Sequence, residues 1–358
     1  VTKQFMKREA YGRVNDPRGI STINGVDKRE YSRFMYAFAD NVMKRLPWYA
    51  FGKSPREVAE RVAEVAEAAS ETLDMTDFSR MDGRHSNVLG YLEKRVLLRA
   101  FMAEYHVQLM ETWNRHHHLA AKTVFGIKYK TEWQRLSGGA DTSAANTLDT
   151  GFIAYYTYRM MGHGANEAWG KLGIYGGDDG LSADMNPTTA KRAALRVGQV
   201  LDLETVKHGG AGVAFLARRY GPDVWFGDTN SCCDIKRQLA KFHLTVNLPS
   251  KVTPVQKLQE KSLSFFLTDK HTPLIGELVR KVLKLFPLPK DKFKNELRIW
   301  GVEMDASKQY PNRRADWMDD IVTAELSDFD LDNFRDWLRK ADGGTIFNPP
   351  RFAESLPP

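Results

Sequence analysis

Two adjacent aspartates, Asp178 and Asp179, follow two glycines within the stretch Lys-Leu-Gly-Ile-Tyr-Gly-Gly-Asp-Asp-Gly-Leu-Ser-Ala-Asp. Short apolar residues lie on both sides of the tetrad, so the pattern predicts a β-hairpin with the acids at its tip. Neighbouring carboxylates repel each other, and a hard divalent cation such as Mg²⁺ or Mn²⁺ would compensate for that repulsion. The alternative is an ordinary turn, because Gly and Asp are common turn formers.

A second acidic pair, Asp77 and Asp82, lies between a short predicted strand and a long predicted helix. If Asp77 faces the acidic hairpin, three carboxylates converge. Such a set can hold two metal ions, one activating an attacking oxygen and the other holding a departing phosphate. The alternative is that one of the two acids only caps the helix that follows.

A glycine-rich loop, residues 137–150, leads into another predicted helix. Thr142 and Asn146 are four residues apart, so their polar side chains share one helix face. The small residues around them leave room for the backbone of a ligand. An ordinary N-capped helix is the alternative, but we favour a ligand-binding loop because polar groups recur on one side.

The composition of the 358 residues limits the class of protein. A net charge of +7 and a sequence pI of about 9.2 favour a polyanionic partner, nucleic acid first and a membrane surface second. The only two cysteines, Cys232 and Cys233, are adjacent, which fits a reducing compartment. No apolar run approaches the ~18 residues of a membrane span. The length suggests two or three subdomains, and the start at Val1 suggests a fragment of a longer protein.

Apolar spacing and turn residues give a coarse order of elements. The clearest start signal is Ser54-Pro55 with Glu57, which predicts a capping box. His116–His118 are expected at a helix end and not as a metal site, because three consecutive side chains point in different directions. Helices are expected at 31–45, at 87–114, at 188–200 and over much of 235–358. One further helix is expected to start at 54, and another is expected to follow the glycine-rich loop and end at about 161. Strands are expected within 70–82, at 124–131 and as a pair within 211–220.

In chain order, three motifs resemble motifs A, B and C of viral RNA-dependent RNA polymerases. They are Asp77-x4-Asp82, Ser137-Gly-x3-Thr142-x3-Asn146-Thr147 and Gly177-Asp178-Asp179. The resemblance extends to motif F at Phe5-Met-Lys-Arg-Glu9 with Asp16-Pro-Arg18, to the motif D lysine at Lys207, and to motif E at Phe215-Leu-Ala-Arg218. Segments 16–25, 215–220 and 241–245 are similar to nodavirus and nodavirus-like replicases of positive-strand RNA viruses.

The resemblance implies an α+β fold, a right-hand polymerase with an RRM-like antiparallel palm sheet, partial fingers and a helical thumb. The implied division is fingers with motif F at 1–70, palm with motif A at 71–100, a fingers insertion at 101–135, palm with motifs B to E at 136–222, and helical thumb with a C-terminal tail at 223–358. Such polymerases have further fingers residues before motif F, so the resemblance implies the C-terminal polymerase portion of a larger replicase.

The implied activity is template-directed RNA synthesis from nucleoside triphosphates, replicating a positive-strand viral genome. Asp77 and Asp178 would bind two Mg²⁺ ions, with Mn²⁺ as a substitute, and Asp179 would support them. Asp82 and Asn146 would read the ribose 2′-hydroxyl, which both donates and accepts hydrogen bonds. Thr142 is expected near this pair.

The remaining implied roles concern the substrate's phosphates and the RNA. Ser137 and Gly138 would form the loop that contacts template and nucleotide. Lys7 and Arg18 would hold the incoming triphosphate, and Lys207 would protonate pyrophosphate as a general acid. Residues 215–218 would grip the priming strand.

The implied partners are RNA template and product, nucleoside triphosphates, upstream replicase regions and further copies of the chain. The implied location is the host cytoplasm, in membrane-associated replication complexes. A reverse transcriptase is one alternative, although Gly177 precedes the aspartates where that class carries Tyr-x-Asp-Asp. A non-catalytic RNA-binding palm module is the other, and the clustered acids Asp77, Asp178 and Asp179 argue against it.

Overall fold

The computed structural model describes residues 2–7, 18–287 and 303–350. Its α-helices are α1 (Gly25–Asn41), α2 (Pro55–Glu67), α3 (Asn87–Ala100), α4 (His106–Asn114), α5 (Thr142–Met160), α6 (Ala165–Gly170), α7 (Pro187–Arg196), α8 (Ile235–Phe242), α9 (Pro254–Asp269), α10 (Ile275–Leu285), α11 (Asp316–Glu325) and α12 (Leu331–Lys340). The strands are β1 (Thr2–Met6), β2 (Gly19–Thr22), β3 (Thr72–Phe78), β4 (Ala120–Thr123), β5 (Lys128–Lys130), β6 (Ile174–Gly176), β7 (Asp179–Ala183), β8 (Leu201–Lys207), β9 (Val213–Phe215), β10 (Arg218–Tyr220) and β11 (Ser231–Cys233).

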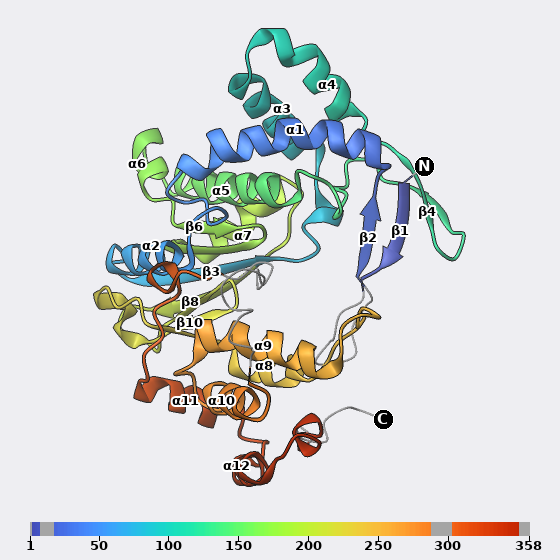
Figure 1. Cartoon of the computed structure of the whole chain (residues 1–358). Helices are drawn as coiled ribbons and strands as arrows, with labels where there is room; N and C mark the ends of the chain where they lie inside the picture. Colours follow the sequence, from blue (N-terminus) through green and yellow to red (C-terminus); the bar gives the residue numbers. More distant parts are fainter. Residues whose placement is uncertain (1, 8–17, 288–302, 351–358) are drawn as a thin grey trace.

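A four-stranded antiparallel sheet with the order β6-β7-β3-β8 lies at the centre of the molecule (Figure 1). Side chains alternate along a strand, so β3 turns Leu73 and Phe78 to opposite faces. Phe78 belongs to the apolar core beneath α5 and α7, and Leu73 to the core shared with α2 and β9–β10. The sheet is therefore covered on both faces.

Helix α2 shows how local sequence fixes an element of this core. Ser54 Oγ accepts a hydrogen bond from the Glu57 amide, and the Glu57 carboxylate accepts one from the Ser54 amide. This capping box confirms the predicted helix start. The apolar stripe that includes Val58 and Val62 is buried against the central sheet.

A second sheet, β2-β1-β4-β5, projects from the body beside α1 (Figure 1). It joins two segments that are far apart in sequence, because β1 pairs in parallel with β4. The sequence pattern at 124–131 predicted one strand, and the structure confirms only its second half, because β5 covers Lys128–Lys130. The chain instead reverses between Thr123 and Lys128, where the Gly126 amide donates to the Thr123 carbonyl and Gly126 takes a φ of +88°.

The long helix predicted at 87–114 was wrong, because α3 ends at Ala100 and α4 begins only at His106. Phe101 takes an extended conformation and packs edge-on against Phe34, with ring centroids 5.4 Å apart. A His106 ring nitrogen lies 2.8 Å from the Phe101 carbonyl oxygen and donates to it. Tertiary packing therefore overrides a continuous helical pattern here.

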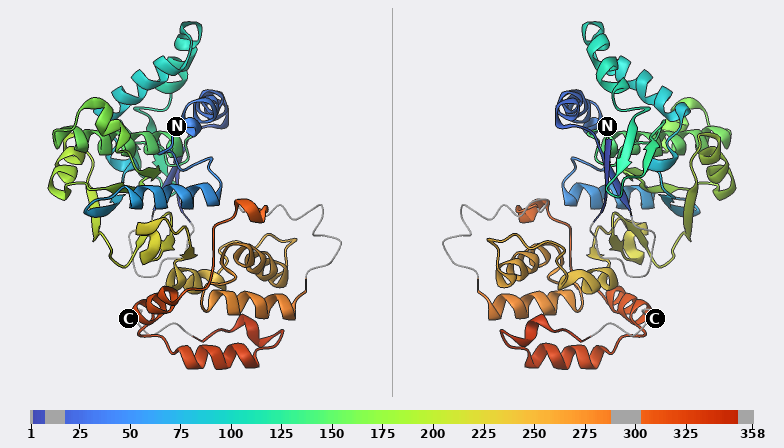
Figure 2. Two further views of the ribbon diagram at one scale, coloured as in Figure 1. Left: turned by 90° about the vertical axis from the view of Figure 1, so that its left-hand side faces the viewer. Right: turned by 90° about the vertical axis from the view of Figure 1, so that its right-hand side faces the viewer.

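Helices α8 to α12 form a separate lobe, coloured from yellow-orange to red in Figure 2. This lobe has its own apolar core, to which Cys232 and Cys233 of β11 contribute. Both cysteines are free and buried, as two thiols in a reducing compartment would be. No helix among the described residues is long and apolar enough to cross a membrane.

Candidate active site

The two adjacent aspartates lie at the tip of the β6–β7 hairpin, as predicted. Gly176 pairs with Asp179, so Gly177 and Asp178 form a two-residue turn. Gly177 has a φ of +71°, and glycine adopts this left-handed conformation without the strain that a Cβ would cause. The hairpin therefore presents Asp178 to solvent and leaves Asp179 half-buried.

Strand register brings Asp77 to the same place. Thr76 of β3 pairs with Gly180 of β7, so Asp77 comes next to Asp179 at the end of the sheet. Burial, then the negative charges of Asp178 and Asp77, raises the pKa of Asp179 to about 6. Desolvation, then the charge of Asp178, raises the pKa of Asp77. The three carboxylates thus converge and repel one another.

The protein's own cations offset this charge only in part. Burial and the neighbouring carboxylates raise the pKa values of Asp77 and Asp179, and the charges of Arg18 and of Arg237 in α8 only partly oppose this rise. No hydrogen bond to the side chain of Asp178 or Asp179 is found among the described residues. Carboxylate oxygens with free lone pairs and surplus negative charge are the donor set that Mg²⁺ and Mn²⁺ prefer.

Sequence reasoning missed Asp202, a fourth carboxylate in this region. It lies on β8 directly opposite Asp77, and its charge contributes to the raised pKa of Asp77. A cavity of about 420 Å³ opens between these acids and the turn after β9, and Lys191 of α7 also lines it. The alternation of Leu201–Lys207 is a strand signal that could have predicted the position of Asp202.

Asp82 and Asn146, which are 64 residues apart, meet through a direct hydrogen bond. Asn146 Nδ2 donates to Asp82 Oδ1 at 2.8 Å, and Asn146 Oδ1 is buried without a partner among the described residues. The alternative that Asp77 or Asp82 caps the following helix was wrong, because the Ser86 hydroxyl accepts the capping bond from Leu89. An orphaned acceptor next to a carboxylate suits a ligand hydroxyl, which can donate to it.

The loop before α5 is anchored at both ends. The Thr142 hydroxyl donates to the carbonyls of Leu136 (3.0 Å) and Gly139 (3.3 Å), so it fixes the loop that contains half-buried Ser137. The Gly138 amide donates to the Ser21 carbonyl at 3.0 Å. A Cβ on Gly138 would come within 2.9 Å of that same oxygen, so only glycine fits this approach to β2.

Helix α5 also holds the acidic hairpin. The Thr147 hydroxyl accepts a hydrogen bond from the Gly177 amide, and the Thr150 hydroxyl donates to the Gly177 carbonyl, both at 2.8 Å. Both threonines are buried. The helix that carries Asn146 therefore grips both polar groups of the turn residue next to Asp178.

Lys7 and Arg18 lie at the end of the β1–β2 hairpin, where the Lys7 amide donates to the Arg18 carbonyl at 2.8 Å. Arg18 lowers the pKa of Asp77, which places its charge near the acidic cluster. The other motif F positions, Arg8, Glu9, Asp16 and Pro17, lie outside the described residues.

Lys207 is not brought to the acids. It pairs with Thr72, whereas Asp202 on the same strand pairs with Asp77. Five residues of strand separate the two pairs, or ~17 Å at about 3.3 Å per residue. The register places Lys207 at the far end of the sheet because β8 runs antiparallel to β3, and this geometry does not favour its assignment as general acid.

A second group of potential metal ligands consists of the buried residues His85, Glu93 and Asp149, whose ligand atoms lie within 4.8 Å of one another. This group surrounds a cation of the protein. The Arg135 guanidinium donates to Glu93 and, at 3.0 Å, to both Asp141 and Asp149. Although burial opposes it, the charge of Arg135 lowers the pKa of Glu93. We therefore interpret this cluster as an internal ion network in which Arg135 occupies the position of the cation.

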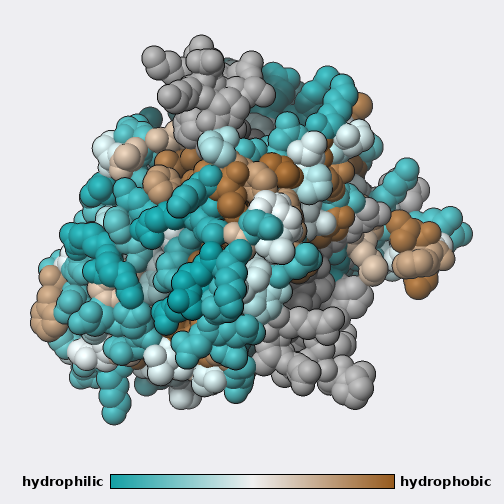
Figure 3. Space-filling view, turned by 60° about the horizontal axis from the view of Figure 1, so that its bottom comes forward, coloured by the Kyte–Doolittle hydropathy of each residue, from teal (hydrophilic) through white to brown (hydrophobic). Residues whose placement is uncertain are grey.

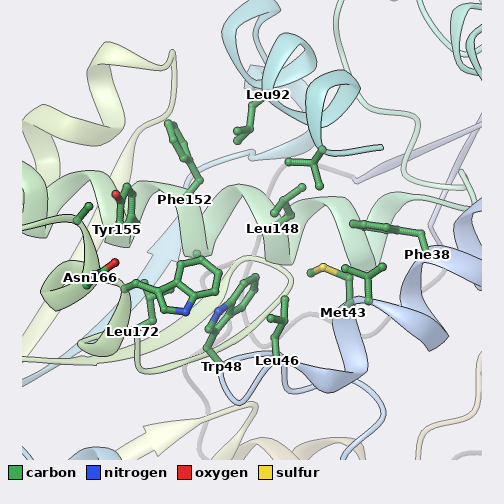
Figure 4. Close-up of a pocket in the computed structure, with 15 residues that line it drawn as sticks. Phe38, Met43, Leu46, Trp48, Leu92, Leu148, Phe152, Tyr155, Asn166 and Leu172 are labelled. Carbon is green, nitrogen blue, oxygen red and sulfur yellow. The ribbon is translucent and has the colours of Figure 1, made fainter. Parts of the chain in front are cut away.

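An apolar cavity of about 560 Å³ lies between α1, α3, α5 and α6, and Figure 4 shows Phe38, Leu148 and Phe152 around it. Its walls contain no Asp, Glu, His, Lys or Arg side chain, so it lacks groups for acid–base or metal chemistry. The candidate active site is the acidic end of the central sheet.

Solved structures identify the fold. The chain superposes on the RNA-dependent RNA polymerase of a human picorbirnavirus with a TM-score of 0.62 and 14% identity, over 75% of this chain and 51% of that one. The insertion-loop deletion mutant of that polymerase gives the same TM-score at 16% identity and covers 53% of its chain. The fold is thus that of viral RNA-dependent RNA polymerases, a mixed α/β fold with helices and antiparallel sheets.

Sequence comparison relates the chain to particular proteins, although no protein-family model matches it. It is 29% identical over 362 residues to an RNA-directed RNA polymerase of Greasy grouper nervous necrosis virus, covering 99% of this chain and 36% of that protein. It is 32% identical over 305 residues to the RNA-directed RNA polymerase of Pariacoto virus, and the match covers 79% of this chain and 29% of that protein. The chain is therefore homologous to nodavirus RNA-directed RNA polymerases, as the motifs indicated, and spans about a third of their length.

Proposed function

We propose that this chain catalyses template-directed RNA synthesis in the replication of a positive-strand viral genome. The observation that carries the proposal is the convergence of Asp77, Asp178 and Asp179 beside the hydrogen-bonded pair Asp82–Asn146. A nucleotidyl transfer needs the first group for metal ions and the second to recognise a ribonucleotide. The homology to RNA-directed RNA polymerases supports the same activity.

Asp77 and Asp178 would hold two Mg²⁺ ions, or Mn²⁺, and Asp179 would support them. The bound ions would stabilise charge on the attacking 3′-oxygen and on the departing pyrophosphate. The raised pKa values of Asp77 and Asp179 fit this role, because carboxylates that repel each other gain most from a divalent cation.

The pair Asp82–Asn146 would select the sugar. A ribose 2′-hydroxyl can donate to the unpartnered Asn146 Oδ1 or to Asp82, whereas a 2′-deoxyribose leaves that buried acceptor unsatisfied. Thr142 would act by holding the loop, since its hydroxyl is already bonded to loop carbonyls. Ser137 and Gly138 would contact nucleotide and template from that loop.

Lys7 and Arg18 would bind the triphosphate, and the effect of Arg18 on Asp77 supports its proximity. For protonation of pyrophosphate, Lys191 is the better candidate than Lys207, because it lines the same cavity as Asp77 and Asp179. Residues 215–218 would grip the priming strand, and Phe215, Leu216 and Ala217 of this segment line the other wall of that cavity.

We also propose the palm, fingers and thumb division of a right-hand polymerase. The central sheet with α5 and α7 would be the palm, within 71–100 and 136–222. The β2-β1-β4-β5 sheet supports combining 1–70 and 101–135 as fingers. Helix α2 packs on the central sheet, so we would assign 46–70 to the palm instead. The lobe at 223–358 would be the thumb.

RNA, nucleoside triphosphates, upstream replicase regions and other copies of the chain would be the partners, in membrane-associated complexes of the host cytoplasm. Reverse transcription is the second candidate, since it uses a similar acid cluster. The bonded Asp82–Asn146 pair favours ribonucleotides over it.

Primer extension tests the proposal. The chain, an RNA template–primer, the four NTPs and Mg²⁺ should give extended RNA, and Asp178→Asn should abolish it. Asp320→Asn is the matched control, because Asp320 belongs to another adjacent pair and is exposed on α11. Extension by Asp178→Asn at the rate of the unmodified chain would refute the assignment, and preference for dNTPs would favour reverse transcription.

A further inference from the structure

Three lysines lie in register across neighbouring strands of the β2-β1-β4-β5 sheet. Lys3 of β1 pairs with Lys122 of β4, and Lys122 pairs with Lys128 of β5. Paired residues project to the same face, and adjacent strands are ~4.8 Å apart. The three side chains therefore form one row of like charges.

This row is electrostatically unfavourable within the protein. Like charges directly opposite each other destabilise a sheet. All three lysines are exposed, and none has an ion-pair partner in the part of the chain that the structure describes. Lys130 is two residues beyond Lys128 and adds a fourth positive charge to the face. A polyanion bound across the strands would turn this repulsion into attraction.

An exposed aromatic ring lies on the same face. Phe5 is two residues from Lys3 on β1, so it projects to the lysine side, and 47% of it is exposed. Proteins that bind single-stranded nucleic acids combine positive charges that contact the phosphates with aromatic rings that stack on the bases. We call Lys3, Phe5, Lys122, Lys128 and Lys130 the lysine face.

The sheet connects the lysine face to the candidate active site. Strand β1 runs from Lys3 to Lys7 over ~13 Å, and the Lys7 amide donates to the carbonyl of Arg18, the residue before β2. On the other side β2 bonds the Gly138 loop. Resting on the proposed function, we propose that the lysine face binds single-stranded RNA and leads the template strand toward the acidic cluster.

The adjoining turn offers a competing partner. Val124, Phe125 and Ile127 are 66%, 78% and 65% exposed, and Figure 3 shows a brown protrusion at the right where this sheet projects. An apolar tip beside lysines is also what an anionic membrane surface would bind. We favour RNA because the charges and Phe5 lie on the sheet face that leads to the site, and not at the tip.

The first experiment measures binding of a labelled single-stranded RNA 20-mer by fluorescence anisotropy at several KCl concentrations, without NTPs. The triple variant Lys3→Gln, Lys122→Gln, Lys128→Gln should lower the slope of log K against log [KCl] by ~2, at about 0.7 per phosphate contact. It should unfold no more easily than the unmodified chain, because repulsion is removed. The control is Lys251→Gln, Lys284→Gln, Lys340→Gln, which removes three exposed lysines from residues 249–340.

The control triple should leave the slope within ~0.5 of the unmodified value. Equal slope changes in the two triples, or none in the first, would overturn the proposal. Phe5→Leu should weaken RNA binding about tenfold at every salt concentration, because stacking on the ring is lost. Phe226→Leu is the control, since Phe226 lies outside the lysine face and is 74% exposed. This variant should bind RNA as tightly as the unmodified chain.

Vesicle flotation separates the partners. Phosphatidylcholine vesicles with and without phosphatidylserine are mixed with the unmodified chain and with the first triple. Lysine-dependent flotation on anionic vesicles, without lysine-dependent RNA binding, would overturn the proposal in favour of a membrane. Asp178→Asn should bind RNA normally while it extends no primer. If no form of the chain incorporates nucleotides but the slope still changes, the proposed activity fails and the RNA-binding face stands.

Discussion

Two clusters of carboxyl groups in the described part of the molecule differ in how closely a cation of the protein contacts them. In the buried cluster, the Arg135 guanidinium bonds Glu93, Asp141 and Asp149 directly. At the end of the central sheet, the charges of Arg18 and Arg237 offset the burial and mutual repulsion of Asp77 and Asp179 only in part. Proximity of acids alone therefore does not define a metal site. The informative difference is whether a cation of the protein bonds the acids directly.

This comparison predicts that acids of the exposed cluster matter for activity and those of the buried cluster for stability. The largest effect is expected from Asp178→Asn, which should lower the primer-extension rate on the order of 10³-fold. The free energy of unfolding from urea titration should hardly change, because Asp178 is exposed. A large loss of stability in this variant would mean that the two clusters do not differ as described.

Arg135→Met should have the opposite profile. Removing this cation leaves the carboxyl groups of Glu93, Asp141 and Asp149 without their shared partner, and breaking a buried pair in this way costs about 3–5 kcal/mol. Urea titration of the variant against the unmodified chain measures this loss. Arg314→Met is the control, since its ion pair with Asp319 is exposed and should contribute less than ~1 kcal/mol. Similar losses in both variants would contradict the comparison.

The exposed cluster should also make stability depend on pH and on metal. The folded-state pKa of Asp179 is about 6, above its ordinary value of 3.8, so the folded chain binds the proton more tightly. Its stabilising contribution is present at pH 4 and is lost as pH rises through 6, by at most ~3 kcal/mol. Unfolding in EDTA should show this fall for the unmodified chain and much less for Asp179→Asn.

Mg²⁺ should restore the stability that the metal-free chain loses near pH 7, and more so in the unmodified chain than in Asp179→Asn. An equal effect of Mg²⁺ on chains with and without the acids would show that the ion binds elsewhere. The comparison would then lose its chemical basis.

The smallest effect on catalysis is expected at the pair Asp82–Asn146, which is proposed to contact the sugar. Asn146→Ala should reduce the preference for NTP over dNTP about tenfold, because one hydrogen bond of ~1.4 kcal/mol is lost. Competitive single-nucleotide incorporation measures the ratio. Thr157→Val, on the same helix but bonded only to the Ile153 carbonyl, should leave that ratio unchanged. An unchanged ratio in Asn146→Ala would remove the proposed role.

Features fixed by neighbouring residues could be predicted from the sequence. The capping box at Ser54 and Glu57 and the turn at Gly177 follow from local hydrogen bonds and backbone freedom. The pairing of Asp82 with Asn146 was predicted only through the resemblance to polymerases, because no local rule joins residues 64 positions apart.

What the sequence could not show depends on tertiary contacts. The break between α3 and α4 follows from the contact of Phe101 with Phe34. The ion network around Arg135 needs acids from three separate segments. The separation of Lys207 from the acids needs the strand register, which the sequence pattern alone leaves open.

The two hydrogen bonds between α5 and Gly177 have a mechanical consequence. Thr147 and Thr150 hold both the amide and the carbonyl of Gly177, and Asn146 comes one residue before Thr147 on the same helix. A displacement of α5 at the sugar must therefore carry the acidic turn with it. If Asn146 and Asp178 have the roles proposed above, recognition of the sugar and positioning of the metal ligands share one rigid part, and an ill-fitting sugar would slow the reaction by misplacing the acids.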